Sequence, residues 1–222
     1  KMDFLGLRTL SIIKECQANI KKRFGIEFDI EKIPIDDAET YALYSRGDTT
    51  SVFQFESPGM KEWLIKLQPT RFEDLIAMNA LYRPGPMDYI PSFIARKQGK
   101  EEIKYDIPVM ERYLKDTYGI TVYQEQVIEI FRRLGGYTLG QADNMRRAIS
   151  KKKQQVIVEE RKAFVYGDTE RGIPGAIAAG VPEAAANAIY DEILDFANYA
   201  FNKAHAVCYA KVSYDTAYLK CH

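Results

Sequence analysis

The stretch VIEIFRRLGGYTLGQADNMRRAIS, residues 127–150, contains two helix signals separated by a stop. Apolar residues recur at helical spacing over 127–134, which gives the first helix one apolar face. The glycine pair at 135–136 ends that pattern. Thr138 and Gln141 then have the spacing of a capping box, which predicts the start of a second helix. This stretch therefore favours a fold built by packing short helices.

The same signals extend over most of the chain. Further helices are predicted at residues 10–24, 36–46, 58 onward, 70–82, 154–166 and 182–196, and from about His205 to the end. Alternation of apolar and polar residues predicts short strands at 1–7, 49–55 and 120–123. We therefore expect a mainly α protein with many helices and a few short strands. Both ends fall inside such patterns, so we expect a piece excised from a longer chain.

Composition excludes some classes of protein and leaves others open. Lys plus Arg and Asp plus Glu each number 31, so the net charge argues neither for nor against nucleic acid. No stretch has the apolar length of a membrane span, and no signal peptide pattern opens the chain. Cys16, Cys208 and Cys221 form an odd, unpatterned set, which favours free thiols in a reducing compartment. Neither Cys208 nor the pair Cys221-His222 has the spacing of a zinc site.

A cluster of cations closes the second helix of the opening stretch. Arg146 and Arg147 lie in its last turn, and Lys151 begins a run of three lysines. Such a group favours phosphate binding. The alternative is that these cations complement the helix dipole and solvate one face.

A second candidate phosphate site lies at the start of the last predicted helix. Lys203 and His205 are placed there, next to backbone N–H groups that a helix start leaves exposed. Phe201 and Tyr209 offer faces on which a base could stack. The alternative is an ordinary helix cap with aromatic core residues.

Two single residues complete the candidate set. Arg83 precedes a Pro-Gly-Pro turn, where a fixed guanidinium suits phosphate or carboxylate, although it could instead cap nearby carbonyls. Asp3 lies in an otherwise apolar segment, which is costly unless the carboxylate is paired or binds metal. One carboxylate does not make a two-metal site, which needs several.

These segments resemble, in colinear order, the bacterial DNA polymerase III alpha subunit family in its DnaE-like branch. The resemblance rests on the segments KMDFLGLRTL (1–10), TTSVFQFES (49–57), FEDLIAMNALYRPGP (72–86), TYGITVYQEQV (117–127), GYTLGQADNMRRAISKKK (136–153) and FANYAFNKAHAVCYAKVSYDTAYLK (196–220). It implies that residues 1–8 end the palm domain and that residues 9–222 form the helical fingers domain.

The resemblance also implies roles for individual residues. Asp3 matches the last of three catalytic aspartates and would bind Mg²⁺ with partners outside this chain. Lys1 matches a palm lysine near the phosphates of the incoming nucleotide. The residues expected to face the triphosphate or DNA are Arg83, Arg146, Arg147, Lys151, Lys203 and His205.

The function implied is template-directed nucleotidyl transfer by two Mg²⁺ ions in a bacterial cytoplasmic polymerase. The expected partners are template-primer DNA, deoxynucleoside triphosphates and the rest of the polymerase chain. The sliding clamp and other replisome subunits would bind through regions outside this chain, and no membrane is expected. The isolated piece is predicted to be inactive. Two alternatives remain open, a non-catalytic helical nucleic-acid-binding module based on residues 132–153 and a helical interaction scaffold.

Overall fold

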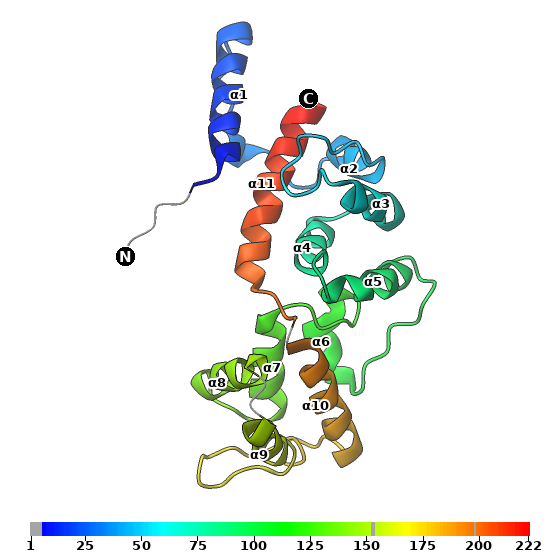
Figure 1. The fold of residues 1–222 in the computed structure, drawn as a ribbon, viewed down its shortest axis with the longest axis vertical. Coiled ribbons are helices and arrows are strands. Elements are labelled where there is room, and N and C mark those ends of the chain that lie inside the picture. Colours follow the sequence, from blue (N-terminus) through cyan, green and yellow to red (C-terminus); the bar gives the residue numbers. More distant parts are fainter. Residues whose placement is uncertain (1–5, 152–153, 198) are drawn as a thin grey trace. The chain divides into compact units, whose positions relative to one another are not determined.

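Helices account for most of the residues that the computed structural model describes, which are 6–151, 154–197 and 199–222 (Figure 1). The chain divides into two units. The first contains Lys1–Asn79 and Ala204–His222, and the second contains Ala80–Lys203. Among the described residues, β-structure is limited to isolated bridges, Tyr123 with Phe201 and Asp168 with Ile173. The mainly α fold predicted from the sequence is therefore confirmed.

The first unit is built around the last helix. Its helices are α1 (Arg8–Phe24), η1 (Ile30–Lys32), α2 (Ala38–Ser45), α3 (Pro58–Leu67), most of α4 (Phe72–Leu81) and nearly all of α11 (Lys203–Cys221). Tyr44 of α2 is fully buried, and its hydroxyl lies 2.7 Å from the hydroxyl of Ser213 on α11. Tyr214 packs its ring on Tyr41 and Phe72. Aromatic packing and one buried hydrogen bond thus attach α11 to the helices of this unit.

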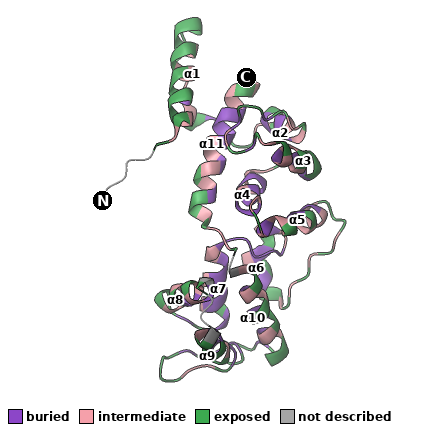
Figure 2. Cartoon of the chain, in the orientation of Figure 1, coloured by how far each residue is buried: buried purple, intermediate pink, exposed green. Residues whose placement is uncertain are grey.

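The second unit has its own apolar core. Its helices are η2 (Pro86–Tyr89), α5 (Ile90–Lys97), η3 (Pro108–Met110), α6 (Glu111–Leu114), η4 (Lys115–Thr117), α7 (Gln124–Leu134), α8 (Leu139–Ser150), α9 (Gln154–Tyr166) and α10 (Glu183–Ala197). Phe131 of α7 is fully buried among the rings of Tyr137, Phe164 and Tyr190. Figure 2 shows α7 buried along much of its length, where α8 and α10 contact it. A buried α7 holds the start of α8 in a fixed position.

Local signals in the sequence set several helix boundaries. Thr138 caps α8, since its hydroxyl accepts the N–H of Gln141 at 3.3 Å and the Gln141 side chain accepts the N–H of Thr138 at 2.9 Å. Ser57 caps α3, with proline at the first helical position. The helix predicted at 154–166 is α9. These boundaries agree because caps depend only on neighbouring residues.

The strand predicted at residues 49–55 is wrong. Ser51 and Gln54 have φ angles of 65° and 67°, so the backbone turns in the left-handed region. The Thr49 hydroxyl donates to the carbonyl of Phe55 at 2.6 Å and closes the loop. Val52 and Phe55 are both buried. Phe53 and Phe55 fit the alternation of a strand, but the two buried residues are three apart, which a strand would place on opposite faces.

The other two predicted strands have different outcomes. Residues 120–123 form no regular strand, and Tyr123 makes a single bridge to Phe201. The predicted strand at 1–7 falls mostly on residues 1–5, outside the described residues. Among the residues that the structure describes, no helix has the length and apolar content needed to cross a membrane.

Candidate functional site

Arg83 lies at the end of α4 and is fixed by backbone oxygens. Its Nε donates to the carbonyl of Ala80 at 2.8 Å, and its Nη2 donates to the carbonyl of Tyr199 at 2.7 Å. The guanidinium carbon lies 4.4 Å from the centre of the Phe201 ring. The capping role that the sequence left open is therefore present. A guanidinium has five N–H donors, so others remain for a ligand.

The charge of Arg83 is not compensated by a carboxylate within the described part of the chain. The residue is half-buried, and this burial lowers the pKa of its guanidinium. An arginine that is partly desolvated and has no acidic partner attracts an anion more strongly than a solvated one does. Arg83 is thus suited to contact a phosphate.

The turn after Arg83 depends on Gly85. Its φ angle is 97°, and a β-carbon there would lie 2.4 Å from Cε1 of Tyr199. Only glycine allows both this backbone conformation and this close approach. Gly85 therefore holds the turn against the same residue whose carbonyl binds Arg83.

The segment at residues 199–203 is attached to the start of α7. The N–H of Phe201 donates to the carbonyl of Val122 at 3.0 Å, and the N–H of Gln124 donates to the carbonyl of Phe201 at 2.9 Å. This attachment holds residues 199–203 against the start of α7 within the second unit.

Glu125 occupies the position where we expected free backbone donors. Its Oε2 accepts the N–H of Lys203 at 2.9 Å, and its Oε1 accepts the side chain of Asn202 at 2.9 Å. One exposed N–H that the sequence suggested for a phosphate is therefore already bonded. Glu125 could not be predicted from sequence as a partner of Lys203, because no local pattern connects residues that far apart.

Lys203 extends from this segment over an aromatic ring. Its Nζ lies 5.4 Å from the centre of the ring of Tyr123, which is buried. The described residues supply no carboxylate within salt-bridge distance of this ammonium. Arg83 and Lys203 thus each contact one of the two rings that the Tyr123–Phe201 bridge joins. Lys203 belongs to the segment at residues 199–203, and Arg83 contacts Tyr199 and Phe201 of the same segment.

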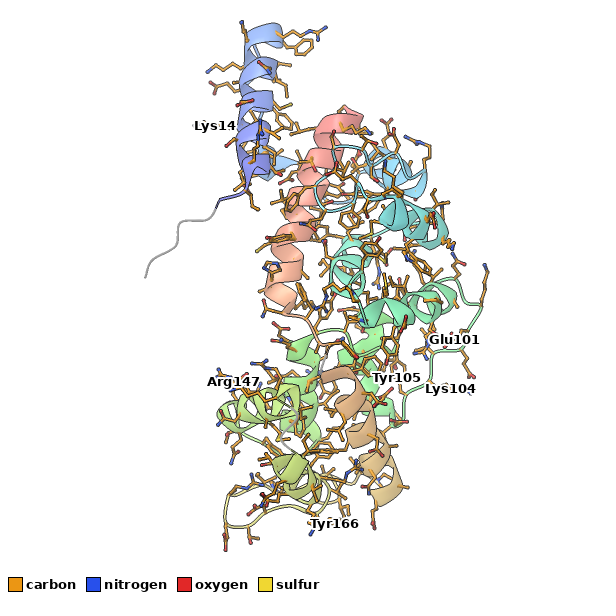
Figure 3. The ribbon with its side chains drawn as sticks, viewed as in Figure 1. Lys14, Glu101, Lys104, Tyr105, Arg147 and Tyr166 are labelled. Atoms are coloured by element: carbon orange, nitrogen blue, oxygen red, sulfur yellow. The ribbon has the colours of Figure 1, made fainter. Side chains whose placement is uncertain are left out.

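Arg146 and Arg147 share one acidic partner, Asp143, on α8. Arg146 contacts Oδ1 at 2.9 Å, and Arg147 contacts Oδ2 at 2.7 Å. The hydrogen bond from Arg146 is the main cause that lowers the pKa of Asp143. The side chain of Arg146 is 17% exposed and that of Arg147 is 63% exposed. Arg147 is labelled on α8 in Figure 3. Spacings of three and four residues could have indicated this group from sequence.

The remaining candidates are Lys151, His205, Lys1 and Asp3. Lys151 is exposed and caps α8 through its own N–H, which donates to the carbonyl of Arg147 at 3.1 Å. His205 belongs to the first unit, where its ring lies 4.1 Å from that of Tyr209. Lys1 and Asp3 lie outside the described residues. The structure thus joins Arg83 with Lys203, and Arg146 with Arg147, as two groups in one unit.

Comparison with known proteins identifies the family. The family described as "Bacterial DNA polymerase III alpha subunit finger domain" has a model that matches residues 9–172. The DNA polymerase III subunit alpha of Halalkalibacterium halodurans is 46% identical over 222 residues, which cover 100% of this chain and 19% of that protein. The DNA polymerase III subunit alpha of Thermus aquaticus is 47% identical over 227 residues, which cover 100% of this chain and 18% of that protein. The chain therefore spans about a fifth of the length of the curated relatives it matches.

Proposed function

Because the chain belongs to the bacterial DNA polymerase III alpha subunit finger domain family, we propose that it is the fingers part of a replicative DNA-directed DNA polymerase. In this function it binds the incoming deoxynucleoside triphosphate and the template-primer DNA. Residues 1–8 end the palm domain, and residues 9–222 form the fingers. The relatives named DNA polymerase III subunit alpha are much longer than this chain, so the rest of the polymerase supplies the remaining parts of the site.

The observation that best supports this proposal is the placement of Arg83 and Lys203 against aromatic rings. Both are cations without a carboxylate partner in the described residues, and both lie against aromatic rings that limit their freedom. A triphosphate gains negative charge on its leaving group during nucleotidyl transfer. Cations that are already oriented stabilise that charge without having to reorganise. These two residues therefore bind and orient the triphosphate.

Arg146, Arg147 and Lys151 provide the second part of the proposed interface. The shared carboxylate of Asp143 orients both guanidiniums and offsets part of their charge. Arg147 is largely exposed and can reach a phosphate of the nucleotide or of the DNA backbone. His205 packs its ring against Tyr209 and is proposed to contact the triphosphate or DNA.

Asp3 is proposed to bind Mg²⁺ together with carboxylates from outside this chain. Bound Mg²⁺ would stabilise the attacking and leaving oxygens of the transfer reaction. Asp3 lies outside the described residues, and one carboxylate does not complete a two-metal site. The isolated chain should therefore incorporate no labelled nucleotide into a primed template.

The alternative of a nucleic-acid-binding module based on residues 132–153 has less support. Arg132 and Arg133 both pair with Glu129, just as the two arginines of α8 pair with Asp143. Much of the positive charge in this region is therefore offset within the unit. A module that depended on this region alone would have a weak field for DNA.

A binding titration tests the proposal on the chain itself. Primed template DNA is titrated with and without the next correct deoxynucleoside triphosphate, at about 50 mM and about 200 mM salt. We expect salt-sensitive DNA binding that the correct nucleotide strengthens and an incorrect one does not. DNA binding that ignores the nucleotide would favour the non-catalytic module instead.

Substitutions in the longer polymerase test the roles of individual residues. Arg83→Ala and Lys203→Ala should each lower kcat/KM for the nucleotide by about 10- to 100-fold, the effect of losing one charged hydrogen bond. Arg161→Ala is the matched control, since this arginine also lies over a ring, that of Tyr190, but pairs with Asp191. An unchanged kcat/KM in either variant would remove that residue from the site.

A further inference from the structure

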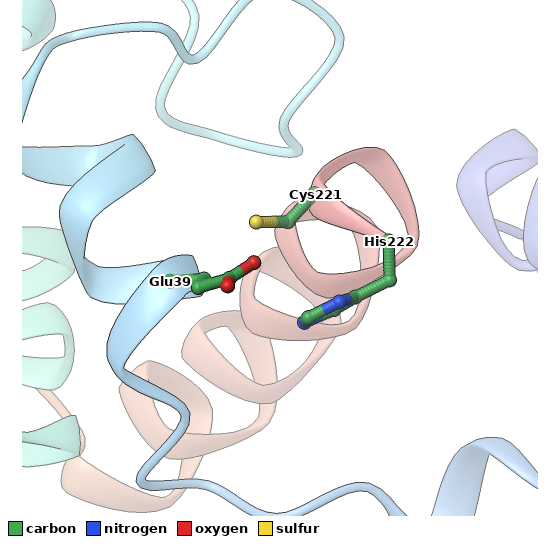
Figure 4. A group of neighbouring side chains, drawn as sticks. All are labelled: Glu39, Cys221 and His222. Carbon is green, nitrogen blue, oxygen red and sulfur yellow. The ribbon is translucent and has the colours of Figure 1, made fainter.

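A group of three potential metal ligands lies in the first unit, and none of the three belongs to the proposed polymerase site. Glu39 is in the first turn of α2. Cys221 is the last residue of α11, and His222 follows it (Figure 4). One carboxylate oxygen, the thiol sulfur and one imidazole nitrogen all lie within 4.8 Å of one another. No zinc-site spacing is visible in the sequence, because Glu39 is far from the other two residues along the chain.

Neighbouring side chains hold the imidazole in place. Nε2 of His222 lies 3.2 Å from Oδ2 of Asp37, and the imidazole ring lies 4.4 Å from the ring of Tyr218. The same Asp37 oxygen accepts the N–H of Thr40 at 2.8 Å, which fixes the carboxylate at the start of α2. A carboxylate bonded to histidine is the usual device that orients a histidine for metal binding. This histidine is thus oriented by a group that is itself fixed.

The three ligand types select a class of metal. Sulfur and nitrogen donors with one carboxylate suit Zn²⁺ and Co²⁺, whereas Mg²⁺ and Ca²⁺ prefer oxygen ligands alone. Zinc bonds of about 2.0–2.3 Å in tetrahedral geometry place ligand atoms roughly 3.3–3.8 Å apart. The side chain of Glu39 is exposed, so a change of its rotamer can close the remaining gap from 4.8 Å while His222 keeps its contact with Asp37.

We propose that Glu39, Cys221 and His222 form a binding site for a zinc-like divalent cation, with Asp37 positioning the histidine. On binding, the S–H bond of Cys221 breaks, its proton leaves to solvent, and the sulfur lone pair bonds the metal. The thiolate and the carboxylate together neutralise the two charges of the cation. The site joins the start of α2 to the end of α11, so a bound cation stabilises this unit.

Titration with Co²⁺ tests the site, because a thiolate bound to Co²⁺ gives an intense charge-transfer absorption in the near ultraviolet. The 222-residue chain, without any histidine tag, is titrated with Co²⁺ under reducing conditions, and Zn²⁺ is then added. We expect the absorption to saturate at one Co²⁺ per chain, to disappear with Zn²⁺ and to persist with excess Mg²⁺. No charge-transfer absorption in the unsubstituted chain would overturn the proposal.

The other two cysteines provide matched controls. Cys221→Ser should abolish the absorption and Glu39→Gln should weaken Co²⁺ binding by at least about tenfold, while Cys208→Ser and Cys16→Ser should bind as the unsubstituted chain does. Absorption that persists in Cys221→Ser would assign the metal to another thiol and refute the site. A chain extended by a few Gly and Ser residues after His222 tests the terminal carboxylate. Loss of binding there would show that the terminus, not Glu39, holds the metal.

Discussion

The carboxylate of Glu125 accepts the backbone N–H of Lys203 at 2.9 Å, and it also accepts the Asn202 side chain. This single residue at the start of α7 therefore fixes Asn202 and Lys203. The position of the Lys203 ammonium over Tyr123 depends on that attachment. Glu125 thus acts on the proposed nucleotide site through its neighbours.

Replacing Glu125 should separate structural from functional effects. Glu125→Ala removes both acceptors and should destabilise the unit by about 0.5–2 kcal/mol, the usual effect of losing a helix cap. In the longer polymerase we expect KM for the nucleotide to rise, and Glu125→Gln should recover part of the loss because its amide oxygen still accepts one bond. Steady-state kinetics and urea unfolding measure the two effects. Equal kinetics for all three proteins would show that Lys203 functions without its backbone bond to Glu125.

Asp143 limits the positive charge that α8 presents. Asp143→Asn should strengthen binding of primed DNA at low salt, because Arg146 and Arg147 lose their shared negative partner. The slope of log K against log salt should become more negative by about 0.9, the value expected for one additional phosphate contact. Asp191→Asn, which removes the partner of Arg161 on α10, is the matched control and should leave the slope unchanged. A slope that Asp143→Asn does not alter would mean that this face of α8 does not contact DNA.

Substitution by alanine should destabilise the chain more at Gly85 than at Gly99. Gly85→Ala forces alanine into positive φ and places its β-carbon against Tyr199. Gly99→Ala also imposes a positive φ, of 69°, but meets nothing within 4 Å, so it gives the cost of positive φ without a steric clash, whereas Gly85 combines a φ of 97° with a ψ of −72°. We expect Gly99→Ala to cost about 1 kcal/mol and Gly85→Ala at least about 1 kcal/mol more. Denaturant unfolding of both variants measures the difference, and equal losses would mean that Tyr199 moves aside freely.

Helix boundaries were the part of the fold most open to prediction. The cap at Thr138 and the glycine stop at 135–136 depend on neighbouring residues, so local sequence contains the needed information. The strand at 49–55 failed because left-handed residues at Ser51 and Gln54 are hard to foresee for side chains other than glycine. Alternation alone does not distinguish a strand from a tight loop with two buried residues.

The candidate site shows the same division between local and distant information. Arg146 and Arg147 were found as a local run of cations, and their pairing with Asp143 follows from helical spacing. The contacts of Arg83 with Tyr199 and Phe201 join residues far apart in the chain. Such contacts exist only after folding, so composition and spacing gave the residue types but not their partners.

Glu192 on α10 offers a test of buried charge in the second unit. Burial raises the pKa of its carboxyl, and Asp106 raises it further. A raised pKa means that the folded state binds the proton more tightly than the unfolded state does. The contribution of Glu192 to stability should therefore fall as pH rises from about 4.3, the ordinary value for glutamate, through the folded-state pKa.

Glu192→Gln removes this dependence because glutamine imitates the protonated carboxyl. We expect the variant to be more stable than the unsubstituted chain at pH 8, with the difference shrinking toward zero as pH falls to about 4. Glu170→Gln, at an exposed residue of the same unit, is the control and should show no such trend. Urea unfolding at several pH values gives the difference in free energy directly. A difference that stays constant with pH would mean that the carboxyl of Glu192 is solvated in the folded chain.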